Sequence, residues 1–403
     1  MSTLIRKHWP LFGAVGLYWV AVIWLIILSV NKNQGHLVYP LDDTYIHMAI
    51  AKNVVLHHIW GVTRYEFTSS TSSPLWTALL AVTYLIFGVN EVLPLVLNVL
   101  LGTFLILASY LFLTKYIINR LIILVILSAV VFFTPLPSLT ITGMEHVLHT
   151  LLSLCFVYFA IEVLSAASKP LQRYYLPLIV LSPLVTTVRY EGIFMVFVVC
   201  VLLLLQRRWL YAVILGTAAL LSVTIYGIWS VANGWYFIPN SVLLKGNTSV
   251  FSLQGVFELL NLKTLGKIQT NGYILFLFIA SSILFLQFYR RKEKSFEERK
   301  YANLIFIGCL LLHMQFASTG WLYRYEAYLV LIGIIVISIS VYELLPEKFV
   351  WKINNEILLY YAVLIPLMLV FVNPFRPRAV ESLKTTFQAT TNIYEQHYQM
   401  GLF

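Results

Sequence analysis

The stretch LFGAVGLYWVAVIWLIILSV at residues 11–30 contains no charged side chain and is 20 residues long. A helix of this length crosses the apolar part of a bilayer. Arg6, Lys7 and His8 precede it, as in a secretory signal peptide, but no small-residue cleavage site follows. We therefore expect residues 10–30 to form the first transmembrane span rather than a leader that is removed.

The rest of the chain is also strongly apolar. Hydrophobic residues make up 60% of its 403 residues, charged residues only 11%, and the mean hydropathy is +0.83. A soluble domain has about 25% charged residues, so this composition excludes a soluble protein. We predict an all-α polytopic membrane protein of about eleven spans. The spans are 10–30, 92–113, 119–134, 144–164, 174–188, 192–206, 211–231, 271–289, 301–317, 326–343 and 356–372.

The net charge of +10 raises the question of nucleic acid, but the basic residues stand in short clusters between apolar segments. We interpret them as topology determinants and expect no nucleic-acid partner. With a cytoplasmic N-terminus, the clusters near Arg6, Lys115, Lys169 and Arg207 and the segment RRKEKSFEERK at 290–300 lie inside. The expected location is the inner, cytoplasmic membrane.

The segment PLWTALLAVTYLIFG at 74–88 has only 15 residues, and counting it as a span would place every later basic loop outside. We predict a juxtamembrane or re-entrant helix instead. The chain is then one transmembrane domain, 1–372, with outer loops at 31–91 and 232–270. Residues 373–403 form a polar extracytoplasmic tail.

In this topology the polar residues that interrupt apolar sequence converge on the outer membrane face. They are Asp42, Asp43, His47, Glu145, His146, Arg189, Glu191, Asn240, Lys245, Arg324 and Glu326. Ionisable groups near a bilayer are costly and mark functional sites, although paired Arg and Glu also serve as structural links. For Arg189 with Glu191 and for Arg324 with Glu326, both interpretations stay open.

Asp42 and Asp43 stand where a short interfacial helix is expected to begin, because Ile46, Ile50 and Val54 repeat at four-residue spacing. One interpretation is helix capping with charges that suit the helix dipole. The other is catalytic, because the acidic pair precedes the hydroxyl-rich loop EFTSSTSSP, which suits a sugar or phosphate. A carboxylate at such a rim acts as a general base by taking the proton of an attacking hydroxyl.

Transfer of a group from a phosphate-linked donor also requires cations near the leaving phosphate. Arg189, Lys245 and Arg324 are the candidates on the predicted outer face. Aromatic residues around them suit either sugar stacking or the aromatic belt of the membrane interface. A divalent metal held by Asp42, Asp43 and His47 is a further hypothesis, although no spacing here is diagnostic of one.

Several motifs follow one another in a recognisable order. They are DDTYIHMAIAKN at 42–53, TSSPLWTALL at 71–80, GMEHVLHTLL from Gly143, RYEG at 189–192, IPNSVLLKG from Ile238, and GWLYRYEAYL from Gly320. In this order they resemble the GT-C superfamily of membrane glycosyltransferases. The resemblance is greatest to bacterial members of the mycobacterial arabinofuranosyltransferase and mannosyltransferase-like group.

This resemblance implies transfer of a sugar from a polyprenyl-phosphate carrier to an extracytoplasmic acceptor, with inversion at the anomeric carbon. The acceptor is a cell-envelope glycan, lipopolysaccharide, lipid or protein. By the same resemblance Asp42 is the general base, with Asp43 beside it. Donor-phosphate or active-site contacts carry over to Glu145, Arg189, Glu191, Lys245 and Arg324. Residues 373–403 resemble the start of the extracytoplasmic domain of these proteins, in a shortened form.

Two other functions compete with this one. A transporter or flippase of a lipid-linked saccharide also uses cations and aromatic residues, but it predicts polar groups through the bilayer midplane. An O-antigen-ligase-like transferase uses an Arg/His pair in an outer loop and does not need Asp42. The gathering of polar residues on one side favours the enzyme.

Overall fold

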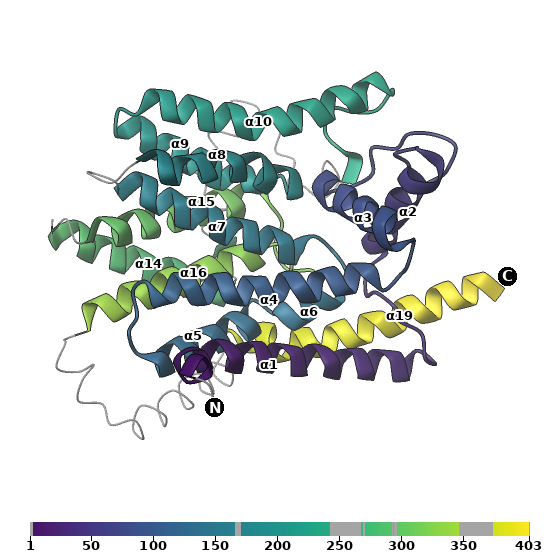
Figure 1. The fold of residues 1–403 in the computed structure, drawn as a ribbon, viewed down its shortest axis with the longest axis horizontal. Coiled ribbons are helices and arrows are strands. Elements are labelled where there is room, and N and C mark those ends of the chain that lie inside the picture. Colours follow the sequence, from purple (N-terminus) through teal and green to yellow (C-terminus); the bar gives the residue numbers. More distant parts are fainter. Residues whose placement is uncertain are drawn as a thin grey trace.

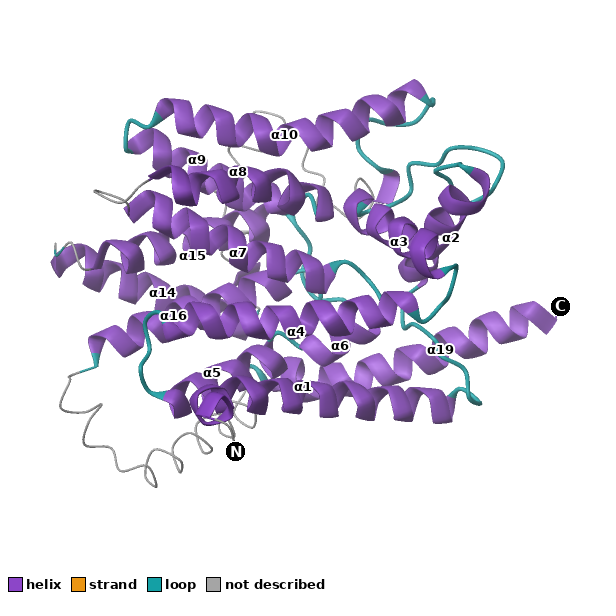
Figure 2. Ribbon diagram, in the orientation of Figure 1, coloured by secondary structure: helices purple, strands orange, loops and turns teal. Residues whose placement is uncertain are grey.

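The computed structural model describes residues 3–165, 171–241, 267–268, 271–291, 293, 296–345 and 374–402. Within these ranges every regular element is helical (Figure 2). The elements are α1 Thr3–Lys32, α2 Asp42–His57, α3 Pro74–Phe87, α4 Leu93–Thr114, α5 Arg120–Phe133, α6 Leu136–Ile141, α7 His146–Ser165, α8 Leu171–Val188, α9 Gly192–Leu205, α10 Trp209–Ala232, α14 Gly272–Arg291, α15 Glu297–Phe316, α16 Ala327–Leu344, the π-helical turn η2 Pro377–Glu381 and α19 Ser382–Leu402.

Ten of the eleven predicted spans coincide with one of these helices, and the eleventh, 356–372, lies outside the described residues. Six helices are long and apolar enough to cross a membrane by length and composition: α1, α4, α7, α10, α14 and α16. The all-helical, multi-pass class is therefore confirmed. The exact number of crossings stays a prediction.

The long helices lie side by side in one bundle (Figure 1). In the most apolar window of each helix, 72% of α7 and 67% of α16 is buried in the protein, against 22% of α1. Helices α7 and α16 therefore form the centre, and α1 carries exposed apolar side chains such as Trp24 and Ile27. A helix that is apolar on all faces suits either burial in the protein or contact with lipid. Helices α7 and α16 are of the first kind, and α1 is of the second.

Helices α2 and α3 lie together at one end of the bundle (Figure 1). Pro74 occupies the first turn of α3, and the Ser73 hydroxyl accepts a 3.3 Å hydrogen bond from the Trp76 backbone N–H. The predicted short helix of 74–88 is therefore present, and its depth in the membrane stays a prediction. We call this end of the bundle, with residues 33–92, the loop end, and the opposite end the far end.

Two features differ from what the sequence indicated. The buried helix α6 interrupts the chain between two predicted spans. The polar tail is also ordered: α19 packs along α1, where the Ser29 hydroxyl donates to Thr390 Oγ1 at 3.0 Å. The buried hydroxyls of Ser382 and Thr390 are hydrogen-bonded, which makes this polar helix compatible with packing.

Candidate active site

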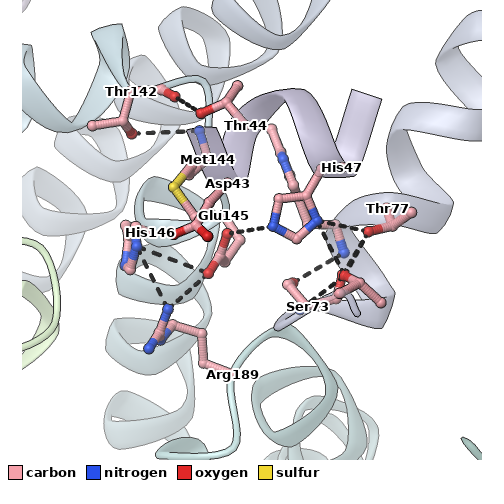
Figure 3. Close-up of polar contacts among 12 residues, drawn as sticks. Asp43, Thr44, His47, Ser73, Thr77, Thr142, Met144, Glu145, His146 and Arg189 are labelled. Atoms are coloured by element: carbon pink, nitrogen blue, oxygen red, sulfur yellow. Dashed lines mark hydrogen bonds and ion pairs between the residues drawn. The ribbon is translucent and has the colours of Figure 1, made fainter. Parts of the chain in front are cut away.

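Four segments of the chain meet at the loop end and bring charged side chains together. Asp43 lies in the first turn of α2, Glu145 directly before α7, Arg189 directly after α8, and Arg324 in the turn that precedes α16. Figure 3 shows Asp43, Glu145 and Arg189 facing one another together with His47. Helix ends leave backbone groups unpaired, so such a junction is naturally polar.

Gly143 permits the close approach of the first loop to the start of α7. Its φ is +65°, and a Cβ at this position would lie 2.5 Å from the Tyr39 ring and 2.8 Å from Thr44 Cγ2. Only glycine adopts this conformation without strain. The Thr44 hydroxyl can therefore donate a 2.6 Å hydrogen bond to the Thr142 carbonyl, which fixes α2 beside Glu145.

Asp43 and Arg324 form the ion pair at the rim of the site. Arg324 Nη2 lies 3.0 Å from Asp43 Oδ2, and Arg324 Nη1 donates to Met144 Sδ. Arg324 is buried, whereas the Asp43 side chain is 23% exposed. Among the described residues Arg324 Nε has no hydrogen-bond partner. The pair thus combines a solvent-accessible carboxylate with a buried guanidinium whose Nε–H is not hydrogen-bonded within the described part of the chain.

Arg189 links two carboxylates beneath this rim. Its guanidinium lies 2.7 Å from Glu145 Oε1 and 2.6 Å from Glu191 Oε1. Burial raises the pKa of the Glu191 carboxyl, but attraction to Arg189 outweighs it and lowers that pKa to about 2. Burial lowers the pKa of Arg189, and both carboxylates overcome this and raise it above its usual range. Arg189 and Glu191 are therefore both charged at neutral pH.

The Tyr325 ring lies close to both arginines. The guanidinium carbons of Arg324 and Arg189 are 4.9 Å and 5.3 Å from its ring centroid. Both distances are within the range of cation–π attraction, which is strongest where water is excluded. Tyr325 therefore stabilises both guanidinium groups, each of which is also paired with a carboxylate.

His47 connects the hydroxyl-rich loop to the buried acid. Its Nδ1 lies 2.8 Å from Thr77 Oγ1 and 3.1 Å from Thr71 Oγ1, and its Nε2 lies 3.6 Å from Glu145 Oε2. Thr71 and Ser73 are buried. The hydroxyls of EFTSSTSSP that we expected to meet a ligand are thus partly used inside the protein, where they orient His47 and cap α3.

The predicted site residues fall into separate groups. Asp43, Glu145, His146, Arg189, Glu191 and Arg324 gather as described, with His146 Nε2 3.5 Å from Arg189 Nη1. Asp42 instead points outward, with its side chain 65% exposed and its Oδ1 3.2 Å from His397 Nε2 of α19. Asn240 contacts the loop through its backbone, donating to the Ser69 carbonyl, and Lys245 lies outside the described residues.

The pairing of Arg324 with Glu326 was wrong. Glu326 lies 2.5 Å from Arg378 Nη1 and accepts from the Tyr273 hydroxyl, so it belongs to a buried contact with the C-terminal segment. Arg324 and Glu326, two positions apart, have different partners, and Asp43 is the one that reaches Arg324. Sequence reasoning missed Arg378, although an Arg in the segment PFRPRAV after an apolar stretch is itself a signal of pairing.

The three residues of the metal hypothesis have different partners. Asp42 lies against His397, Asp43 against Arg324, and His47 against Thr77 and Glu145. Within the described ranges no group of three or more His, Cys, Asp or Glu side chains is arranged to hold a metal ion. The donor set expected from the sequence is therefore not assembled in this conformation.

Comparison with known proteins places the fold. No protein-family model and no curated protein sequence matches the chain. Among solved structures, ArnT from Cupriavidus metallidurans bound to undecaprenyl phosphate aligns with a TM-score of 0.53 and 13% identity over 95% of this chain and 76% of ArnT. The apo oligosaccharyltransferase of Archaeoglobus fulgidus aligns with a TM-score of 0.50 and 12% identity over 97% of this chain and 57% of its own.

The chain thus has the fold of the GT-C membrane glycosyltransferases, the class that its motifs resemble. It spans about three quarters of the length of ArnT and little over half of the oligosaccharyltransferase. At such low identity the likeness concerns architecture, and the subgroup within the class is not defined by it. The chemistry must be argued from the residues at the loop end.

Proposed function

We propose that the protein is a membrane glycosyltransferase that moves a sugar from a polyprenyl-phosphate donor to the hydroxyl of an acceptor. The observation that carries the proposal is the Asp43–Arg324 pair, in which a solvent-accessible carboxylate lies against a buried cation at the loop end of a GT-C fold. The undecaprenyl phosphate bound to ArnT supports a donor of this chemical class.

In the proposed reaction Arg324 binds the donor phosphate, with the Tyr325 ring packed against its guanidinium and Arg189 held nearby by Glu145 and Glu191. Asp43 accepts the proton of the acceptor hydroxyl as its oxygen attacks the anomeric carbon. The bond from that carbon to the phosphate oxygen breaks, and polyprenyl phosphate leaves with its negative charge stabilised by the arginines. A single displacement inverts the configuration.

The contacts favour Asp43 over Asp42 as the base. Asp42 is the first acidic residue after the first span, which made it the expected base, but its side chain faces α19 and bulk solvent. Asp43 is next to the cation that is to hold the phosphate, so the anomeric carbon would lie within its reach. Proton transfer requires such proximity before any tuning of the pKa matters.

We further propose that the site lies on the extracytoplasmic side of the inner membrane. Helix α1 begins at the far end, where Arg120 donates to the Arg6 carbonyl, and ends at the loop end. If the basic clusters mark the cytoplasmic side, the loop end is outside. The acceptor is then a glycan, a lipid or a protein outside the cytoplasm. A divalent metal belongs to the proposal only as an additive to be tested in the assay.

The test is transfer of a radiolabelled sugar from a polyprenyl-phosphate donor by the purified full chain. We expect Asp43→Asn to reduce turnover by about 10²–10⁴-fold, because general-base catalysis contributes that much. Asp42→Asn is the matched control, since it makes the same change one residue away, and we expect it to keep turnover within about fivefold. Chelator and added Mg²⁺ or Mn²⁺ in parallel samples measure the metal dependence.

The outcomes separate the alternatives. Full transfer by Asp43→Asn with loss in Asp42→Asn would return the role of base to Asp42. Retention of transfer in both variants, together with its loss in Arg324→Gln, would favour a ligase-like mechanism without a carboxylate base. Movement of intact lipid-linked saccharide across vesicles, without any transfer, would indicate a flippase.

A further inference from the structure

The turn that carries Arg324 has an unusual backbone. Trp321, Leu322 and Tyr323 have φ angles of +45°, +62° and +57°, so three successive residues with side chains are in the left-handed region. A side chain disfavours this conformation, because its Cβ lies too close to the following carbonyl oxygen. Such strain persists only where the surroundings enforce it, and it concentrates at functional sites.

Two buried side chains enforce this conformation. Glu326 Oε2 accepts a 3.0 Å hydrogen bond from the Gly320 N–H, which closes the turn on itself. Arg378, from the C-terminal segment, donates to the Tyr323 carbonyl at 3.0 Å and lies 2.5 Å from Glu326 Oε1. Glu326 and Arg378 are both fully buried. The two ends of the strained turn are therefore held by one ion pair.

A third contact anchors that pair to the bundle. Arg378 Nε donates to the Phe133 carbonyl at 2.7 Å, at the end of α5. The guanidinium also lies 4.9 Å from the Tyr273 ring centroid and 5.2 Å from that of Tyr323. One planar group thus connects α5, α14 and the turn, which a flexible ammonium could not do.

We infer that Arg378 is a positioning residue that holds Arg324 in place for the donor phosphate. This inference rests on the proposed function, because it assigns Arg378 its effect through the phosphate contact of Arg324. Arg378 itself does not touch the substrate. The C-terminal segment is then part of the machinery of the site, although it lies more than 50 residues after Arg324 in the chain.

The inference makes Arg378→Lys the informative substitution. Lysine keeps the positive charge opposite Glu326, so the buried carboxylate retains a partner. It loses the fork that reaches the Phe133 and Tyr323 carbonyls at the same time. Arg376→Lys is the matched control, because Arg376 is two residues away and exposed.

The measurement is equilibrium binding of undecaprenyl phosphate to the purified full chain. We expect Arg324→Gln to weaken binding by about tenfold or more, since hydrogen bonds to charged groups contribute about 1.5–3 kcal/mol. We expect Arg378→Lys to weaken it about three- to tenfold and Arg376→Lys to leave it unchanged. In the Arg324→Gln background, Arg378→Lys should have no further effect, because coupled residues are non-additive.

Each outcome bears on the inference. Equal and additive losses in both backgrounds would show that Arg378 acts through general stability and would overturn it. Normal binding by Arg378→Lys, with weak binding by Arg324→Gln, would also overturn it while leaving the proposed function intact. No loss in Arg324→Gln would refute the phosphate site and the inference together.

A second variant covers the case in which Arg378→Lys does not fold. Replacing both members of a buried ion pair by apolar residues leaves no unpaired charge, so Arg378→Met with Glu326→Met avoids the main cost of a single replacement. It releases both ends of the strained turn. Weaker binding of undecaprenyl phosphate by this folded double variant supports the inference, and unchanged binding overturns it.

Discussion

Charged side chains gather at both ends of the helix bundle, and the two groups differ in how they are built. The site cluster at the loop end consists of Asp43, Glu145, Arg189, Glu191 and Arg324. The far-end cluster consists of Lys115, Glu162, Glu298, Arg299 and Glu343, and it joins residues of α7, α15 and α16 to Lys115 at the end of α4. Helix α7 runs between the two clusters.

The far-end cluster is held together by its own members, although Arg299 Nε has no hydrogen-bond partner among the described residues. Lys115 contacts Glu162 and lies 3.1 Å from Glu298, and Arg299 lies 2.7 Å from Glu343. Four of its side chains, all except Glu162, are 12–30% exposed. The cluster ties helix ends together next to water, where ion pairs contribute little individually.

The site cluster is more deeply buried. Glu145 is fully buried, and its Oε2 has no hydrogen-bond partner among the described residues, while Arg324 Nε is in the same condition. It also lies beside the strained turn at 321–323. Buried polar atoms without partners and a strained backbone lower stability, which is typical of sites kept for binding or catalysis. Deeper burial and the adjacent strained turn therefore distinguish the site cluster from the far-end cluster.

The largest effect on stability is expected from Arg189→Met. It leaves the carboxylates of Glu145 and Glu191 buried without their cation, and breaking a buried pair costs about 3–5 kcal/mol. Thermal unfolding in detergent should show a large decrease in the midpoint. Arg173→Met is the control, because Arg173 lies in α8, the helix that ends directly before Arg189, and is exposed. An unchanged midpoint in Arg189→Met would show that the ion pairs of Arg189 do not stabilise the fold, and would contradict the prediction.

The Glu191 carboxylate should make the stability of the protein depend on pH in the acid range. Its pKa is lowered from 4.5 to about 2, so the stabilisation is complete above about pH 5 and is lost as the pH falls toward 2. Over this range the contribution amounts to about 2–3 kcal/mol. Unfolding midpoints measured between pH 6 and 3 should fall less in Glu191→Gln than in the native chain. Parallel curves for the two proteins would contradict the strong pairing with Arg189.

A smaller effect is expected at the far end. Lys115→Met removes the cation opposite Glu162, and because Lys115 is 30% exposed, water can partly replace it. We expect a loss of about 1–2 kcal/mol in stability, below that of a fully buried pair. The sugar-transfer rate of the folded protein should stay within about twofold, with Lys32→Met as an exposed control. A loss of transfer at equal stability would give the far-end cluster a functional role.

The sequence predicted the helices well and their contacts poorly, for a physical reason. Runs of apolar residues locate spans directly, because the hydrocarbon core of the bilayer requires each lipid-facing residue of a span to be apolar. Partners are decided by tertiary approach: Arg324 reaches Asp43, 281 positions away, rather than Glu326, two positions away. The sequence placed Arg189 with Glu191 correctly because both stand in one short turn closed by Gly192. The sequence offered Arg378 as a candidate for pairing, but its partners could be identified only once α5 and the turn at 320–323 were in place.

The smallest effect is expected where Asp42 meets the C-terminal helix. His397 Nε2 is 3.2 Å from Asp42 Oδ1, but both side chains are more than half exposed, at 54% and 65%. Exposed ion pairs contribute about 0–1 kcal/mol, so His397→Gln should leave the unfolding midpoint and the transfer rate nearly unchanged. Both quantities are to be measured beside Arg378→Lys, which alters the same C-terminal segment. If His397→Gln instead impaired transfer as much as Asp43→Asn does, the reacting centre would lie between α2 and α19, and Asp42 would be its carboxylate.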